Sequence, residues 1–154
     1  MWAIKKVGAK RENDICRFIP MTSGGYMHHF TLKKMKTKQH DFKQSGGTHA
    51  AAAFSMEGEL LCTMEDIGRH NAVDKIVGYL LKNQIKRDDV YIITSGRISS
   101  DILLKSALIN IGLVVSRSAP TSLAVKLAEK LNITIVGFAR GKKLNIYTHS
   151  DRLV

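Results

Sequence analysis

The feature that most constrains the fold is a regular alternation that begins after Asp89. Residues 90–93, 113–115 and 133–136 are short runs rich in β-branched side chains, as is typical of strands buried on both faces. Apolar residues at helical spacing fill the two intervals, namely Ile102, Leu103, Ala107, Leu108 and Ile111, and then Leu123, Ala124, Leu127, Ala128 and Leu131. This β-α-β-α-β order predicts a partly parallel sheet with right-handed crossovers.

The ends of these predicted helices carry their own signals. Ser99 or Ser100 is suited to cap the first helix, and Gly112 is expected to stop it. Pro120 suits the first helical position of the second helix, because its ring fixes a helical φ and no N–H is needed there.

Two further strands are predicted outside this alternation. Residues 60–63 are expected to pair, across the turn at 57–58, with a strand near Ala53 and Phe54. Residues 144–147 alternate in polarity and are expected to form an edge strand. A chain of 154 residues is long enough for one domain with a real core.

The loops after the three parallel strands are the first candidate for a binding site. Such strands end at the same edge of a sheet, where open α/β folds bind ligands. Arginine forks and nearby backbone N–H groups bind phosphate. The alternative is that turns simply favour serine and glycine and that the cations are solvated. The polar residues of these loops include Ser95, Gly96, Arg97, Arg117, Ser118, Arg140, Lys142 and Lys143.

A second candidate is the polar run of residues 65–75, EDIGRHNAVDK. Gly68 permits a tight turn, and apolar residues at helical spacing follow, so the run lies where a loop becomes a helix. Free N–H groups at a helix start can bind an anion, with Arg69 and His70 supplying charge. Glu65 and Asp66 would either hold these cations or bind a ligand hydroxyl or amine. The same residues would equally form a cap with ion pairs, and His70 could be an acid–base group or an ion-pair partner.

Charge and composition limit the partners. The net charge is +11, of which residues 1–44 carry +7 through ten Lys/Arg against three Asp/Glu. Such a segment attracts polyanions, but no aromatic platform or zinc-finger spacing points to nucleic acid. No apolar stretch suits a membrane span or a signal peptide, so a cytoplasmic protein without membrane contact is expected. Two cysteines, Cys16 and Cys62, fit a reducing compartment.

The polar run and three other motifs together resemble the formate dehydrogenase accessory proteins, the FdhD family. The other three are residues 45–52 (SGGTHAAA), 94–97 (TSGR) and 118–124 (SAPTSLA), and the tail at 137–141 (GFARG) and 146–149 (IYTH) also agrees. The resemblance covers residues 30–152. It therefore divides the chain into an unmatched basic segment, 1–29, and a single α/β cofactor-binding domain, 30–154.

The resemblance implies a fold and a ligand. The fold would be a three-layer α/β/α sandwich with a mixed, partly parallel sheet, similar to that of cytidine deaminases. The ligand, or cargo, would be the molybdenum cofactor Mo-bis(molybdopterin guanine dinucleotide). The family segment that contacts it corresponds here to Phe138, Ala139, Arg140, Gly141, Lys142 and Lys143. The pocket would be completed by Ser95, Gly96, Arg97, Ser118, Glu65, Asp66, Arg69 and His70.

Zinc chemistry is not expected despite that fold. Zinc deaminases need His-x-Glu and Pro-Cys-x-x-Cys. The comparable places here are His49 with Ala51 two residues later, and Pro120 followed by no cysteine. His28, His29 and His40 lie on an unpatterned basic segment, so we expect no metal site, and no catalytic residue is assigned.

The resemblance also implies a role in sulfur transfer. The family passes sulfur from a cysteine desulfurase to the cofactor for the formate dehydrogenase apoenzyme, using a Cys-x-x-Cys motif; a homodimer is expected. This chain has no Cys-x-x-Cys, so whether it is itself an enzyme stays open. It would be a shortened version, a cofactor-binding remnant, or a variant that uses Cys16, with Cys62 a buried apolar residue. The alternative function is a basic nucleotide- or RNA-binding module without sulfur transfer.

Overall fold

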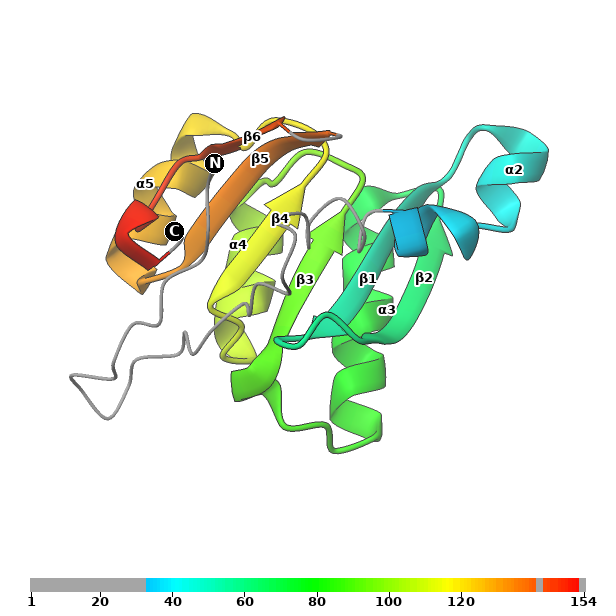
Figure 1. Ribbon diagram of the computed structural model, residues 1–154, viewed down its shortest axis with the longest axis horizontal. Coiled ribbons are helices and arrows are strands. Elements are labelled where there is room, and N and C mark those ends of the chain that lie inside the picture. Colours follow the sequence, from blue (N-terminus) through cyan, green and yellow to red (C-terminus); the bar gives the residue numbers. More distant parts are fainter. Residues whose placement is uncertain (1–32, 141–142, 153–154) are drawn as a thin grey trace.

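The structure is a computed structural model that describes residues 33–140 and 143–152. Its centre is a six-stranded sheet in the order β2-β1-β3-β4-β5-β6 (Figure 1). The strands are β1 (His49–Ser55), β2 (Leu60–Asp66), β3 (Val90–Thr94), β4 (Leu113–Ser116), β5 (Thr134–Arg140) and β6 (Lys143–Ile146).

The strand directions confirm the predicted mixed, partly parallel α/β sheet. β3, β4 and β5 are parallel, whereas β1 runs antiparallel to both β2 and β3, and β6 runs antiparallel to β5. The carboxyl ends of the three parallel strands therefore share one edge with the start of β1, the end of β2 and the start of β6. We call this the strand-end edge.

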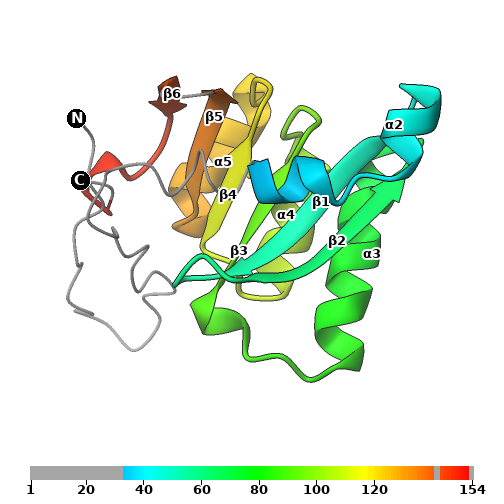
Figure 2. The same cartoon turned by 45° about the vertical axis from the view of Figure 1, so that its right-hand side comes forward.

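Three helices cover one face of the sheet, as both views show (Figures 1 and 2). They are α3 (Arg69–Lys82), α4 (Ser100–Leu108) and α5 (Ser122–Leu131). The opposite face carries a helical turn at residues 33–37, which buries Met35 against the sheet. The short helix α2 (Asp41–Ser45) projects beyond β2, and 3₁₀ turns occupy Arg87–Asp89 and Ser150–Arg152.

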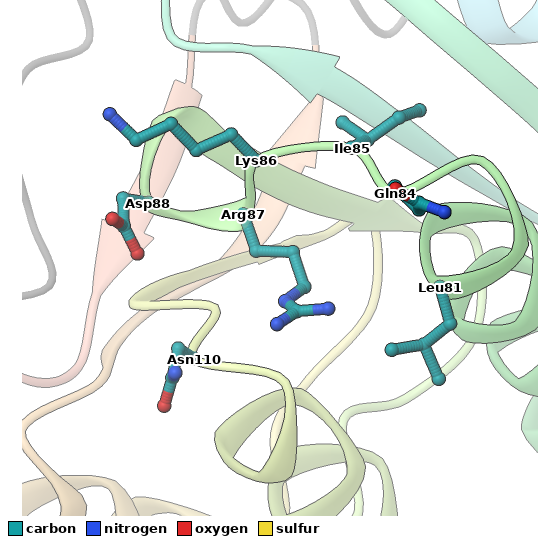
Figure 3. A pocket seen from close by; sticks show the side chains of 7 residues that line it. All are labelled: Leu81, Gln84, Ile85, Lys86, Arg87, Asp88 and Asn110. Carbon is teal, nitrogen blue, oxygen red and sulfur yellow. The ribbon is translucent and has the colours of Figure 1, made fainter.

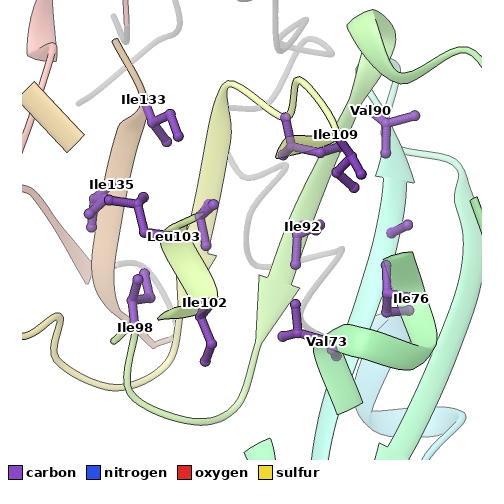
Figure 4. Packing of buried hydrophobic residues seen from close by; sticks show 14 of the residues in the cluster. Val73, Ile76, Val90, Ile92, Ile98, Ile102, Leu103, Ile109, Ile133 and Ile135 are labelled. Carbon is purple, nitrogen blue, oxygen red and sulfur yellow. The ribbon is translucent and has the colours of Figure 1, made fainter. Parts of the chain in front are cut away.

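The core has two parts, one on each face of the sheet. Under the helices, isoleucine, leucine and valine side chains of the strands interdigitate with those of α3 and α4 (Figure 4). On the other face, Phe54 and Tyr91 stack with ring centroids 5.6 Å apart. Because β-branched residues pack on both faces, the central strands are buried throughout, as their uninterrupted apolar runs predict.

Several predicted boundaries need correction. α4 ends at Leu108, four residues before Gly112, because Asn110 takes the left-handed conformation at φ 59°. Pro120 is not helical: it pairs with Ile98 in an isolated parallel bridge, and Thr121 caps α5 by accepting the Ala124 N–H at 3.2 Å. Ser99 is confirmed as the cap of α4.

Two other expectations differ in detail. β5 continues to Arg140, so residues 137–140, expected as a loop, belong to a strand with a bulge. Leu108 and Leu123 were placed on buried helical stripes but are 83% and 57% exposed. In the part of the chain that the structure describes, no helix is long and apolar enough to cross a membrane.

Candidate functional site at the strand-end edge

The predicted site residues that the structure describes all lie at the strand-end edge. Ser95, Gly96 and Arg97 follow β3, and Ser118 follows β4. The end of β5 carries Phe138, Ala139 and Arg140, the end of β2 carries Glu65 and Asp66, and α3 begins with Arg69 and His70. Lys143 opens β6, and Gly141 and Lys142 lie outside the described residues.

The Arg69 side chain packs closely on Gly96 at this edge. A Cβ on Gly96 would lie 2.8 Å from Arg69 Cβ and 3.0 Å from its Cδ, so only glycine lets the Arg69 side chain rest there. Nε of Arg69 is buried, yet among the described residues it has no hydrogen-bond partner. A cation in the first turn of a helix also opposes the helix dipole. Both features are unfavourable within the chain, and an anion beside the guanidinium would offset the positive charge at the helix start.

The end of β5 stores backbone strain. Phe138 has φ 50°, a left-handed conformation that is rare for an aromatic residue, and its N–H donates to Ser118 O at 3.1 Å. Gly137 before it is tightly enclosed, because a Cβ there would lie 2.9 Å from both Pro120 and Tyr147. In this backbone conformation Phe138 is 40% exposed. Strain of this kind collects at functional sites, and here it presents an aromatic ring to solvent.

The neighbours of Phe138 in β5 differ from each other. Arg140 is exposed, and its Nε donates to Arg117 O at 3.0 Å, which leaves the rest of the guanidinium to face solvent. Ala139 has no exposed surface and packs in the core on the face opposite the three helices. Of this predicted segment, the structure therefore exposes Phe138 and Arg140 and places Ala139 beneath them.

Glu65 is engaged entirely within the chain. Its carboxylate accepts hydrogen bonds from the N–H groups at the start of α2 and from the Thr48 hydroxyl, at 2.7–3.1 Å, the N–H donors being His40, Asp41 and Phe42. Burial alone would raise the pKa of Glu65, but these four donors outweigh it and lower the pKa below its ordinary value. The side chain therefore anchors α2 and has little capacity left for a ligand.

Asp66 is likewise used to shape the turn into α3. It pairs with Lys75 at 2.7 Å and accepts the Gly68 N–H at 2.9 Å and the Asn71 amide at 3.1 Å. The Lys75 ammonium, followed by these two donors, lowers its pKa to about 2. Gly68 caps α3 with an ordinary φ of −92°, and a Cβ there would meet the Asn71 amide at 3.2 Å. Asp66 and Gly68 therefore form a helix cap with an ion pair, which was the alternative to ligand binding for this part of residues 65–75.

Two histidines join neighbouring elements at the same edge. His70 Nε2 lies 2.8 Å from Ser99 Oγ, so the start of α3 meets the start of α4. His49 Nδ1 lies 3.4 Å from Ser95 Oγ, which also accepts the Ala50 N–H at 3.0 Å. His70 therefore contacts a capping serine, and neither Asp66 nor Asp74 is its partner. Sequence reasoning missed Thr94 and Ser116 as site-shaping residues, although a hydroxyl directly after each apolar strand run was a usable signal.

A surface hollow of about 420 Å³ lies at the opposite end of the sheet (Figure 3). It is lined by Leu81, Gln84, Ile85, Lys86, Arg87, Asp88 and Asn110. None of the predicted site residues lines it, and most of its side chains are exposed. We place the candidate site at the strand-end edge, where a buried nitrogen lacks a partner and strained backbone presents an aromatic ring.

Comparison with known proteins decides the family. The model of the FdhD/NarQ family matches residues 26–154. The chain belongs to the FdhD/NarQ family. Proteins named sulfur carrier protein FdhD are 50% identical over 122 residues in Listeria innocua and 48% identical over 122 residues in Saccharolobus solfataricus. Each alignment covers 79% of this chain but only 46% and 48% of the relative, so the chain spans about half their length.

A solved structure agrees with this assignment. The crystal structure of a candidate formate dehydrogenase accessory protein from Desulfotalea psychrophila superposes with a TM-score of 0.75 at 31% identity. The superposition covers 82% of this chain and 56% of the Desulfotalea psychrophila chain. The fold of an FdhD/NarQ family member is thus the fold found here.

The described cysteine is unsuited to sulfur chemistry. Cys62 is a free cysteine in β2, buried against Ala53 and the core under α3, as expected for an apolar residue. Burial raises the pKa of its thiol to about 11, so the reactive thiolate is scarce at neutral pH. Cys16 lies outside the described residues, as do His28 and His29. Within the described ranges, no three His, Cys, Asp or Glu residues are grouped as a metal site would need.

Proposed function

We propose that this chain binds the guanine-dinucleotide form of the molybdenum cofactor during formate dehydrogenase maturation, through the strand-end edge. The observation that carries the proposal is Arg69 at the start of α3. Its side chain rests on Gly96, and its buried Nε has no partner in the part of the chain that the structure describes. The positive guanidinium of Arg69, beside the N–H groups of the helix start, would favour a phosphate there.

The rest of the edge fits the same ligand. Arg97 and Arg140 are exposed at the ends of β3 and β5, and both can add charge to a pyrophosphate. The exposed ring of Phe138 offers a surface on which a guanine can stack. We also propose that Gly141, Lys142 and Lys143 contact the ligand. Gly141, Lys142 and the side chain of Lys143 lie outside the part of the chain that the structure describes.

Sulfur transfer is a separate part of the proposal. Sulfur carrier protein FdhD is the name of the relatives, whereas this sequence has only Cys16 and Cys62 and no Cys-x-x-Cys. With Cys62 buried, the described residues would hold the cofactor as cargo rather than carry a persulfide. A cysteine desulfurase, a formate dehydrogenase apoenzyme and a second copy of the chain are the proposed partners.

Calorimetric titration of the full chain with GDP, and then with ADP, tests the proposal. We expect saturable binding of GDP that is clearly tighter than that of ADP and only moderately weakened by salt. Arg140→Ala should weaken GDP binding about tenfold, and Lys82→Ala, which removes an exposed charge at the other end of α3, should not. Equal and strongly salt-dependent binding of both nucleotides would contradict the proposal and favour a basic nucleotide- or RNA-binding surface.

A further inference from the structure

Ser116 is the only fully buried serine that ends a strand among the described residues, and it bonds two different strand-end loops. Its hydroxyl donates to Gly96 O, after β3, at 2.6 Å. The same hydroxyl accepts the Ser118 N–H, after β4, at 2.8 Å. Donor and acceptor capacity of the hydroxyl are thus used across the gap between the two loops.

These bonds lead to both exposed parts of the candidate site. On one side, the N–H of Gly96 donates to Thr94 Oγ1 at 3.2 Å, and its carbonyl accepts from Ser116. Both backbone polar groups of Gly96 are therefore held in place where Arg69 packs on it. On the other side, Ser118 O accepts the N–H of the strained Phe138 at 3.1 Å. The Ser116 hydroxyl therefore connects the residue that supports Arg69 with the residue that holds Phe138.

We propose that Ser116 is a positioning residue that sets the spacing between the Arg69 part and the Phe138 part of the site. This inference rests on the proposed function, because it concerns a ligand that contacts both parts at once. A guanine nucleotide has its base and its phosphates at opposite ends, so its affinity depends on the distance between the groups that receive them. A serine with no exposed surface cannot touch the ligand itself and acts through the two loops.

Ser116→Ala would leave Gly96 O and the Ser118 N–H without their buried partner, and the two loops would become free to separate. Ser106 offers a matched control, because it is also a fully buried serine and its hydroxyl donates to Ile102 O at 2.9 Å within α4. Both alanine variants lose a buried hydroxyl bond. Only Ser116→Ala disturbs the connection between the loops.

The test is GDP titration of the two variants of the full chain beside the wild type. Ser116→Ala should weaken GDP binding about tenfold, and Ser106→Ala should leave it within about twofold. In the background of Phe138→Ala, the effect of Ser116→Ala should largely disappear, because one of the two positioned groups is already gone. Full additivity of these two substitutions, or equal GDP binding by Ser116→Ala and wild type, would overturn the proposal.

Amide hydrogen exchange supplies a readout that needs no ligand. Ser116→Ala should speed exchange at the Phe138 N–H, which is one residue and one further bond away, whereas Ser106→Ala should not. If Ser116→Ala does not fold, Thr94→Val, of similar shape, removes the acceptor of the Gly96 N–H and should weaken GDP binding in the same direction. A wild-type chain that fails to bind GDP would refute the proposed function, while unchanged exchange at Phe138 would separately refute the role of Ser116.

Discussion

Glu65 and Arg69 lie four residues apart in one polar run. Glu65 accepts four hydrogen bonds, whereas the buried Nε of Arg69 has no partner within residues 33–140 and 143–152. Both side chains were predicted to bind the same ligand. The difference shows that the role of a charged residue at a helix start can be assigned only after its partners inside the chain are known. The carboxylates of the run build the fold, and the arginine is left to act on something outside it.

The largest effect should come from the carboxylate half of this comparison. Glu65→Ala removes the acceptor of three N–H groups at the start of α2, so the free energy of unfolding should fall by about 2 kcal/mol, a value kept low because the site is near solvent. Urea denaturation measures it, with Glu57→Ala at the exposed β1–β2 turn as control. GDP affinity of the folded variant should stay close to wild type, and a loss of affinity at unchanged stability would reverse the roles assigned here.

Arg69→Ala should give the opposite pattern. GDP affinity should fall about tenfold, which corresponds to about 1.4 kcal/mol. The free energy of unfolding should not decrease, because the substitution removes an unpartnered buried nitrogen and a cation at a helix start. Calorimetry and thermal unfolding measure the two quantities. A variant that is destabilised but binds GDP normally would show that Arg69 is structural.

Acid should weaken the fold through the same carboxylates. The folded-state pKa of Asp66 is lowered from an ordinary 3.8 to about 2, so its ion pair stabilises the fold fully above about pH 4. That contribution is lost as the pH falls from about 4 toward 2, because in this range the unfolded state binds a proton at Asp66 more readily than the folded state does. Asp66→Asn should flatten the pH dependence of the unfolding free energy in this window, and Asp88→Asn, at an exposed position, should not. Parallel pH curves for wild type and Asp66→Asn would contradict the assignment.

The smallest effect is expected at Cys62, which lies in β2 and is buried in the core under α3. Iodoacetamide at neutral pH should leave Cys62 unmodified in the folded chain and label it after denaturation, because burial raises its thiol pKa to about 11. Peptide mapping by mass spectrometry measures this. Rapid labelling of native Cys62 would contradict its assignment as a buried apolar residue and would make it a candidate sulfur carrier.

Sequence patterns predicted the architecture better than the roles of individual residues. The buried strands and the shared edge followed from apolar runs that have few other stable arrangements, and the helices followed from their spacing. The end of α4 was missed because Asn110 took the left-handed position expected of Gly112, a choice that local propensity does not fix.

The sequence predicted a set of candidate site residues but not the hydrogen bonds that they form with one another. Strand order predicted Arg69 and Gly96 at the strand-end edge and the family resemblance added Phe138, and the structure places all three at that edge. The engagement of Glu65 with α2 depends on a contact across 25 residues of sequence, and the exposed ring of Phe138 depends on a bulge. Neither the contact nor the bulge could be predicted from the neighbouring sequence.

An NMR titration of the ¹⁵N-labelled chain with GDP would test the central claim most directly, because it shows where the ligand binds. The account predicts shifts confined to amides of the strand-end edge, including Gly96, Arg97, Ser118 and Phe138, with those of residues 84–88 at the opposite hollow unchanged. Shifts centred on the hollow, or spread over the basic residues 33–43, would contradict binding at the strand-end edge and would move the binding site away from Arg69.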